Sequence, residues 1–139
     1  MTHGIDHDPL EASEQDRGNR ELVERFFAAS ERGDLAALET MVDDGIVMDW
    51  PQSGERFRGR ENVLGAMAAV EVKPQFAGSP RLVGSGELWV LTVPLRYGED
   101  VLQYVAILEL ERGRIRRATG YWGGPFPAQA SRAAFVDRA

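Results

Sequence analysis

The sequence predicts an α+β fold, in which a group of helices precedes an antiparallel sheet. Two observations lead to this class. Helical patterns dominate the first half of the chain, and segments rich in β-branched and aromatic residues fill the second half. Helices grouped ahead of a long sheet are typical of α+β domains. The 139 residues, 43% of them hydrophobic, are enough to form one core.

Residues 1–16 differ in composition from the rest of the chain. They hold five of the 22 acidic residues and no Lys or Arg. A segment of small and acidic residues has little apolar surface to bury, so we expect a disordered acidic leader there and a single domain over residues 17–139. That domain holds 17 acidic and 16 basic residues, which gives no electrostatic reason to bind nucleic acid or an anionic membrane.

Three helices are expected in the first half. The first carries one apolar stripe, with Asn19 as its N-cap and Gly33 at its end. Asp34 is expected to cap the second helix, whose apolar residues again share one face. The third helix follows Gly59 and ends ahead of Pro74, because the residue before a proline disfavours helical backbone.

Strands account for most of the remaining chain. The expected strands cover residues 46–50, 75–83, 87–97, 101–111 and 114–122. Pro80 bends or delays the second of them, and residues 52–58 are expected to form a loop. Turns containing Gly join the last three strands into an antiparallel meander. Both faces of this meander are substantially apolar, which predicts that helices cover one face and a second copy of the chain covers the other.

The composition excludes several kinds of site. The chain has no Cys, and its two histidines are His3 and His7, so thiol chemistry is excluded and histidine catalysis or metal ligation inside the fold is not expected. No Gly-rich phosphate loop or Ser nucleophile motif is present, and we expect neither a metal nor a cofactor. No apolar run reaches the length of a membrane span and no secretion signal is visible, so the expected location is the cytoplasm.

Asp49 is the first candidate for chemistry, because it stands in the apolar run Val47-Met48-Asp49-Trp50. Burial raises the pKa of a carboxyl group and would make Asp49 a general base near neutral pH. The alternative is that Asp49 faces outward or caps the loop that follows. Tyr104 is the second candidate. Its hydroxyl would donate a hydrogen bond into a cavity, or else belong to an ordinary buried tyrosine.

Several spaced motifs occur in the order Val23-Glu24-Arg25-Phe26-Phe27, Gly33-Asp34-Leu35, Asp43 to Pro51, Phe57 to Val63, and Gly113-Arg114-Ile115 with Tyr121-Trp122. Together they resemble the SnoaL-like branch of the nuclear transport factor 2-like superfamily, over about residues 17–127. The resemblance implies a curved antiparallel sheet wrapped around the N-terminal helices as a cone, a cystatin-like α+β roll. It also implies an apolar pocket at the open end. The superfamily hosts many chemistries, so the fold alone does not imply an activity.

The resemblance further implies which residues form the pocket. They are apolar and aromatic side chains from the first helix and the strands: Phe26, Trp50, Trp89, Leu91, Val93, Leu95, Tyr104, Ala106 and Trp122. In ketosteroid isomerases of this superfamily, an Asp before a Pro on the first strand removes a proton next to a carbonyl. Asp49 matches that position, with Trp50 inserted before Pro51. The positions that hold the oxyanion in the isomerase correspond to Phe26 and Ala106 here, so those donors are missing.

Two hypotheses follow for the function. In the first, a homodimer binds an apolar, carbonyl-bearing molecule and isomerises, cyclises or dehydrates it, with Asp49 as the base. Tyr104 then donates a hydrogen bond, and Trp50 and Trp122 form the walls. In the second, the chain is a non-catalytic ligand-binding or dimeric assembly module, because the catalytic sets known in the superfamily are incomplete here. We also expect the segment from Pro125 to Phe135 to cross to a partner subunit and help close its pocket.

Overall fold

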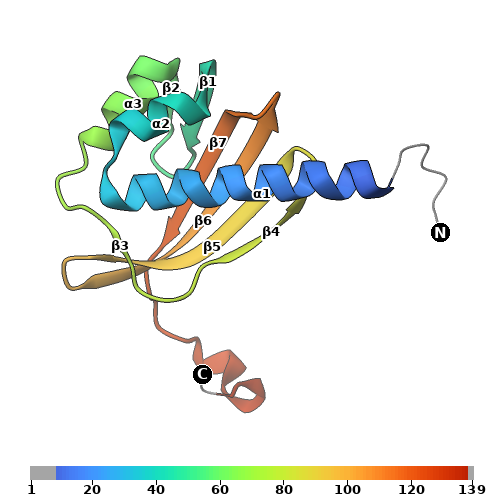
Figure 1. The fold of residues 1–139 in the computed structure, drawn as a ribbon. Coiled ribbons are helices and arrows are strands. Elements are labelled where there is room, and N and C mark those ends of the chain that lie inside the picture. Colours follow the sequence, from blue (N-terminus) through green and yellow to red (C-terminus); the bar gives the residue numbers. More distant parts are fainter. Residues whose placement is uncertain (1–8, 138–139) are drawn as a thin grey trace.

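The structure, a computed structural model, describes residues 9–137 and has the α+β architecture that the sequence predicts (Figure 1). Its α-helices are α1 (Pro9–Arg32), α2 (Leu35–Met41) and α3 (Arg60–Ala68), and a 3-10 helix, η1 (Ala130–Phe135), lies near the C-terminus. α1 runs across one face of a curved sheet (Figure 1). Within the described residues, none of the helices combines the length and apolar character that crossing a bilayer requires.

The sheet has seven strands: β1 (Val42–Trp50), β2 (Glu55–Arg58), β3 (Gln75–Phe76), β4 (Arg81–Ser85), β5 (Leu88–Tyr97), β6 (Asp100–Glu111) and β7 (Arg114–Gly123). Their order is β2-β1-β7-β6-β5-β3, with β4 also paired to β5, so the sheet does not close on itself. β1 and β7 are parallel, and the other pairs are antiparallel. The meander β5-β6-β7 confirms the three long strands expected from the sequence.

The first helix begins at Pro9, earlier than expected, and the division into a leader and a domain at residue 17 stays a prediction. Residues 1–8 lie outside the described part of the chain. Asn19 is not an N-cap. Its Nδ2 donates a hydrogen bond to the carbonyl of Gly86 over 2.7 Å, and Asp16 Oδ1 accepts one from the Gly86 N–H over 2.7 Å. The β4–β5 turn therefore anchors this part of α1, which a local sequence pattern does not reveal.

The other local predictions are confirmed at the junction of α1 and α2 and differ from the structure in two strand segments. Gly33, at φ +70°, follows the last residue of α1, and Asp34 caps α2 by accepting a hydrogen bond from the Ala37 N–H over 3.1 Å, as expected. The expected strand over residues 75–83 is divided into β3 and β4 on either side of Pro80. The loop expected over residues 52–58 contains an additional strand, β2, which pairs with β1.

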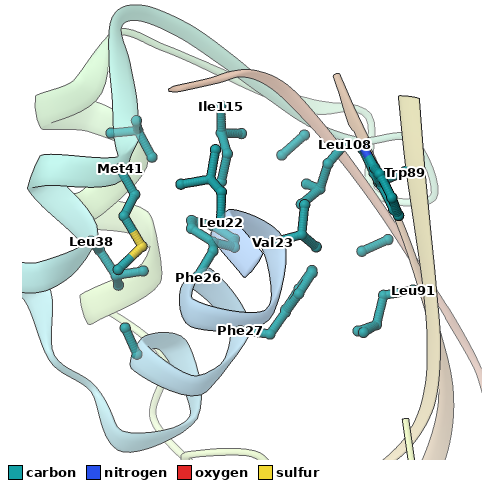
Figure 2. Close-up of a cluster of buried hydrophobic side chains, with 14 of the residues drawn as sticks. Leu22, Val23, Phe26, Phe27, Leu38, Met41, Trp89, Leu91, Leu108 and Ile115 are labelled. Atoms are coloured by element: carbon teal, nitrogen blue, oxygen red, sulfur yellow. The ribbon is translucent and has the colours of Figure 1, made fainter. Parts of the chain in front are cut away.

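The core lies between α1, α2 and the face of the sheet that α1 covers, here called the inner face (Figure 2). Its labelled residues come from all three parts: Leu22, Val23, Phe26, Phe27, Leu38, Met41, Trp89, Leu91, Leu108 and Ile115. Trp89 is almost fully buried, and its indole N–H donates a hydrogen bond to the Gly86 carbonyl over 2.9 Å. Burial of these large side chains is the main source of the domain's stability.

The opposite face of the sheet, here called the outer face, carries exposed apolar side chains. Val83, Leu88 and Tyr121 are 46%, 53% and 39% exposed. Beyond β7 the chain leaves the sheet (Figure 1), and the apolar residues Phe126 and Phe135 of this C-terminal arm are 81% and 88% exposed. The arm, residues 125–136, therefore buries almost none of its apolar surface within its own chain.

Candidate functional site

A cavity of about 350 Å³ opens between the C-terminal half of α1, the inner face of the sheet and residues 73–76. This size lies within the range of about 300–1,000 Å³ that is usual for small-molecule sites. Most of the side chains that line it are apolar or aromatic. The cavity is therefore the feature of the molecule best suited to hold an apolar small molecule.

Aromatic side chains form one continuous wall of the cavity. The ring of Trp122 lies between those of Trp50 and Tyr104, with centroid distances of 5.5 Å to Trp50 and 5.0 Å to Tyr104. Phe27 extends this wall from α1, with its ring centroid 6.5 Å from that of Tyr104. Aromatic rings at such separations attract one another and present flat apolar surface.

The strands and a neighbouring loop fix this wall in place. Antiparallel pairing of β6 with β7 sets Tyr104 opposite Trp122. Gly120 leaves room for the indole, because a Cβ there would lie 3.0 Å from the Trp122 ring. The side-chain amide of Gln52 accepts a hydrogen bond from the Trp122 N–H over 2.7 Å and donates one to the Trp122 carbonyl. The end of β7 is thus held where it borders the cavity.

Two tyrosine hydroxyls supply polar groups to this apolar cavity. Tyr97 Oη accepts a hydrogen bond from the Trp122 indole N–H over 2.8 Å, so its own proton stays available to another acceptor. The Tyr104 hydroxyl has no hydrogen-bond partner within the described residues and is not sealed off from the cavity. Burial raises the pKa of both phenols. Both therefore stay protonated, and both can donate hydrogen bonds.

Two charged side chains, Glu31 and Lys73, also line the cavity. Glu31 Oε2 accepts a hydrogen bond from the Phe76 N–H over 2.8 Å. Lys73 is exposed, and its amine lies against Gly33 at the end of α1. Because Lys73 and Phe76 belong to the segment that leads into β3, both charged groups lie where this segment meets the C-terminal end of α1.

Asp49 does not lie in the cavity. Met48 and Trp50 line it, and successive residues of a strand point to opposite faces, so Asp49 points to the outer face. There its carboxylate is paired with Arg56 and Arg117, with Nε–Oδ1 and Nη2–Oδ2 distances of 2.6 Å each.

The pKa of Asp49 is lowered, whereas from the sequence we expected burial to raise it. The hydrogen bond from Arg56 holds the pKa of the Asp49 carboxyl below its usual value, with Arg117 acting in the same direction, and this outweighs burial. The expectation of a raised pKa in an apolar hollow is therefore wrong. Asp49 stays ionised near neutral pH, but its oxygens already accept hydrogen bonds and face away from any molecule in the cavity.

The other expected site residues fall into two groups. Phe26, Trp50, Leu95, Tyr104, Ala106 and Trp122 all line the cavity, where their contact with a ligand stays a prediction. Trp89, Leu91 and Val93 do not line it, which corrects the expectation for these three residues. They are at most 4% exposed and belong to the core, where Figure 2 shows Trp89 and Leu91 on the sheet face that α1 covers.

Three residues that line the cavity were not predicted from the sequence: Tyr97, Glu31 and Lys73. Tyr97 continues the alternation of Trp89, Leu91, Val93 and Leu95 on β5, so its face could have been inferred. Glu31 follows the apolar stripe of the first helix without being part of it. Lys73 lies outside every regular element, and no local pattern indicates where its side chain points. Within the described residues, no cluster of His, Asp or Glu side chains is suited to a metal.

One protein-family model matches the chain. Residues 23–118 match the SnoaL-like domain. A comparison with curated proteins found no match to the sequence.

Solved structures share the architecture. An NTF-2 like protein of unknown function from Burkholderia xenovorans is 32% identical, with a TM-score of 0.76 over 88% of this chain and 96% of that one. A candidate ketosteroid isomerase from Kribbella flavida is 22% identical, with a TM-score of 0.84 over 90% and 92% of the two chains. A candidate polyketide cyclase from Xanthomonas campestris is 18% identical, with a TM-score of 0.72 over 78% and 93%. At these identities, the likeness to the last two concerns the fold alone.

Proposed function

Because the chain belongs to the SnoaL-like domain family, we propose that its cavity binds an apolar small molecule that carries a carbonyl oxygen. One observation supports this proposal above all others. The protonated hydroxyls of Tyr97 and Tyr104 reach a cavity whose walls are otherwise mainly apolar. A pocket with much apolar surface and a few well-placed polar groups is the usual form of a small-molecule site.

The aromatic wall binds the body of the ligand. Trp50, Trp122 and Phe27 offer flat surfaces against which a ring or a fused ring system packs, and burial of apolar area supplies most of the binding free energy. Because Gln52 fixes the backbone at Trp122, the wall is already formed before a ligand arrives. A preformed wall lowers the entropy cost of binding.

The two hydroxyls orient the ligand. A carbonyl oxygen has two lone pairs and accepts hydrogen bonds without donating any, which matches two phenol donors. A ligand that lacks this oxygen leaves the hydroxyls without an acceptor when it displaces water from the cavity. Sites that are built to hydrogen-bond a ligand group discriminate strongly against analogues without it.

Proton-transfer catalysis is the second candidate function. It is favoured by the presence of one carboxylate, Glu31, on the cavity wall, and by two structural neighbours that carry the names of an isomerase and a cyclase. In such a reaction, Glu31 would remove a proton from the carbon next to the carbonyl. The tyrosine hydroxyls would then donate hydrogen bonds to the enolate oxygen until the proton returns to another carbon. Asp49 is not assigned this role, because its carboxylate is paired with Arg56 and Arg117.

We also propose that two copies of the chain form a homodimer through their outer faces. Val83, Leu88 and Tyr121 are exposed there, although the chain is otherwise rich in charged residues. A symmetric dimer brings the same apolar patch of each copy together and removes it from water.

The ligand proposal is tested with a matched pair of probes, benzophenone and diphenylmethane, which differ only in the carbonyl group. Each is titrated while the fluorescence of the cavity tryptophans is recorded. We expect benzophenone to bind about fivefold more tightly, as one or two net hydrogen bonds require. Equal affinities contradict the role of the hydroxyls, and failure of both probes to bind contradicts the proposed cavity function as a whole.

A further inference from the structure

Lys73 is the only lysine in the chain, whose other 15 basic residues are all Arg. It is also the one basic residue that lines the cavity within the described part of the chain. Its side chain extends from the segment between α3 and β3 towards the end of α1. There the amine lies so close to Gly33 that a Cβ at that position would overlap it. The α1–α2 junction therefore leaves space for the ammonium at the cavity mouth.

Within residues 14–137, no ion pair neutralises the charge of Lys73. Glu31 lines the same cavity, but its Oε2 accepts the Phe76 N–H and it forms no ion pair with Lys73, while Asp34 accepts the Ala37 N–H and is paired with Arg32. An unpaired ammonium at the mouth of a mainly apolar cavity attracts an anionic group on whatever occupies that cavity.

Lys73 and Tyr97 both line the cavity, and Lys73 lies two residues before β3, which pairs with β5. Antiparallel pairing sets Gln75 opposite Arg96 and Phe76 opposite Leu95. An ammonium and a phenol hydroxyl thus both belong to the wall of one cavity. Each can bind a carboxylate oxygen, the ammonium by charge and the hydroxyl by a hydrogen bond.

We propose that Lys73 binds a carboxylate head group, so that the natural ligand is an apolar carboxylic acid with its body against the aromatic wall. This inference rests on the proposed ligand-binding function and narrows its substrate class. The domain is nearly neutral, with 17 acidic and 16 basic residues, so its overall charge does not favour binding of an acid. Selectivity for acids must therefore come from a local cation, and Lys73 is in position to supply it.

The test compares the 3- and 4-carboxylates of benzophenone with their methyl esters, which have nearly the same size and no charge. We expect at least one acid to bind the wild-type chain about fivefold more tightly than its ester, with the preference shrinking at high salt. Lys73→Gln should abolish this preference, whereas Lys73→Arg should largely keep it. Because Lys73 is exposed, neither variant is expected to unfold.

Arg114→Gln is the matched control. It removes one positive charge from an exposed residue at the start of β7, whereas the cavity lies near the end of that strand, and it should leave the preference unchanged. The inference is overturned if neither acid binds better than its ester, or if the preference survives in Lys73→Gln. Unmodified benzophenone separates the two proposals. If it binds while the acids show no preference, only the role of Lys73 fails, and if it does not bind, the cavity function fails as well.

Discussion

The indole N–H of Trp122 donates a hydrogen bond to the hydroxyl oxygen of Tyr97 over 2.8 Å, which links the ends of β7 and β5 across the cavity. The bond orients the Trp122 ring, which packs against Trp50 and Tyr104. It also directs the remaining proton of Tyr97 to other acceptors. One hydrogen bond thus contributes both to the shape of the cavity wall and to its polarity.

Tyr97→Phe tests this link. The substitution leaves the Trp122 N–H without its partner, so we expect the free energy of unfolding to fall by about 1 kcal/mol. Benzophenone should also bind several-fold more weakly, because the wall loses its fixed orientation and one donor is lost. Urea unfolding and fluorescence titration measure the two effects. Tyr121→Phe is the control for binding, because Tyr121 lies on the outer face, away from the cavity, and removal of its hydroxyl should leave the affinity unchanged.

Gly120→Ala tests how closely the aromatic wall is packed. A Cβ at this position would lie 3.0 Å from the Trp122 ring, which must shift by a few tenths of an ångström, and in ordinary contact, 3.5 Å, with the Tyr104 ring. We expect the affinity for benzophenone to fall several-fold and the free energy of unfolding to fall by about 1 kcal/mol. The matched control is Gly65→Ala within α3, where a Cβ meets no atom within 4 Å. That change should stabilise the helix by about 0.5–1 kcal/mol and leave binding unchanged. Unchanged binding in Gly120→Ala would show that Trp122 does not contact the ligand.

Asp49→Asn separates a structural from a chemical role of this carboxylate. Solvent screens the pair with the half-exposed Arg56, so we expect a loss of about 1 kcal/mol of unfolding free energy at pH 7 and no change in ligand affinity. The folded-state pKa of Asp49 lies below its ordinary value of 3.8. The stability that its charge contributes is therefore present above about pH 4 and disappears as the pH falls through the lowered pKa.

The measurement for Asp49 is a series of urea unfolding curves of both proteins between pH 2 and 7. The two curves of stability against pH should converge at the acidic end. A variant that keeps full stability but loses binding or turnover would contradict the structure and restore Asp49 to the cavity chemistry.

Truncation after Gly124 tests the C-terminal arm. Phe126 and Phe135 are almost fully exposed within one chain, so a role in packing requires a second copy. We expect the dimer dissociation constant, measured by sedimentation, to rise on the order of tenfold, while the stability of the monomer stays the same. Replacing both phenylalanines by Ser in the full-length chain should reproduce the effect. An unchanged dissociation constant in both variants would exclude the arm from the interface.

The fold was largely predictable because its signals are local. Gly33 and Asp34 mark the junction of α1 and α2, and the Gly-containing turns define the β5-β6-β7 meander. The start of α1 was not predictable in this way, because Asp16 and Asn19 bind Gly86, which lies in a distant turn. β2 was missed because its polar sequence is stabilised by pairing with β1 and not by a hydrophobic pattern.

The site was predictable only in part, because membership of a cavity depends on which face a side chain takes. The two-residue period of β1 already sets Asp49 on the opposite face from Met48 and Trp50. Asp49 was nevertheless predicted to lie in the cavity, because it matches the position of the catalytic Asp in the isomerases. The same period on β5 would have identified Tyr97. Lys73 was beyond prediction, because its position depends on how the segment between α3 and β3 lies across the end of α1.

The most direct test of the central claim is the carbonyl preference of Tyr104→Phe. Within the described residues the Tyr104 hydroxyl has no protein partner, so its removal should leave the unfolding free energy nearly unchanged. The ratio of benzophenone to diphenylmethane affinity should fall from about fivefold towards unity in the variant, because benzophenone alone loses a hydrogen bond. A ratio that is the same in wild type and variant, in a chain that remains folded, would contradict the claim that this hydroxyl recognises the ligand.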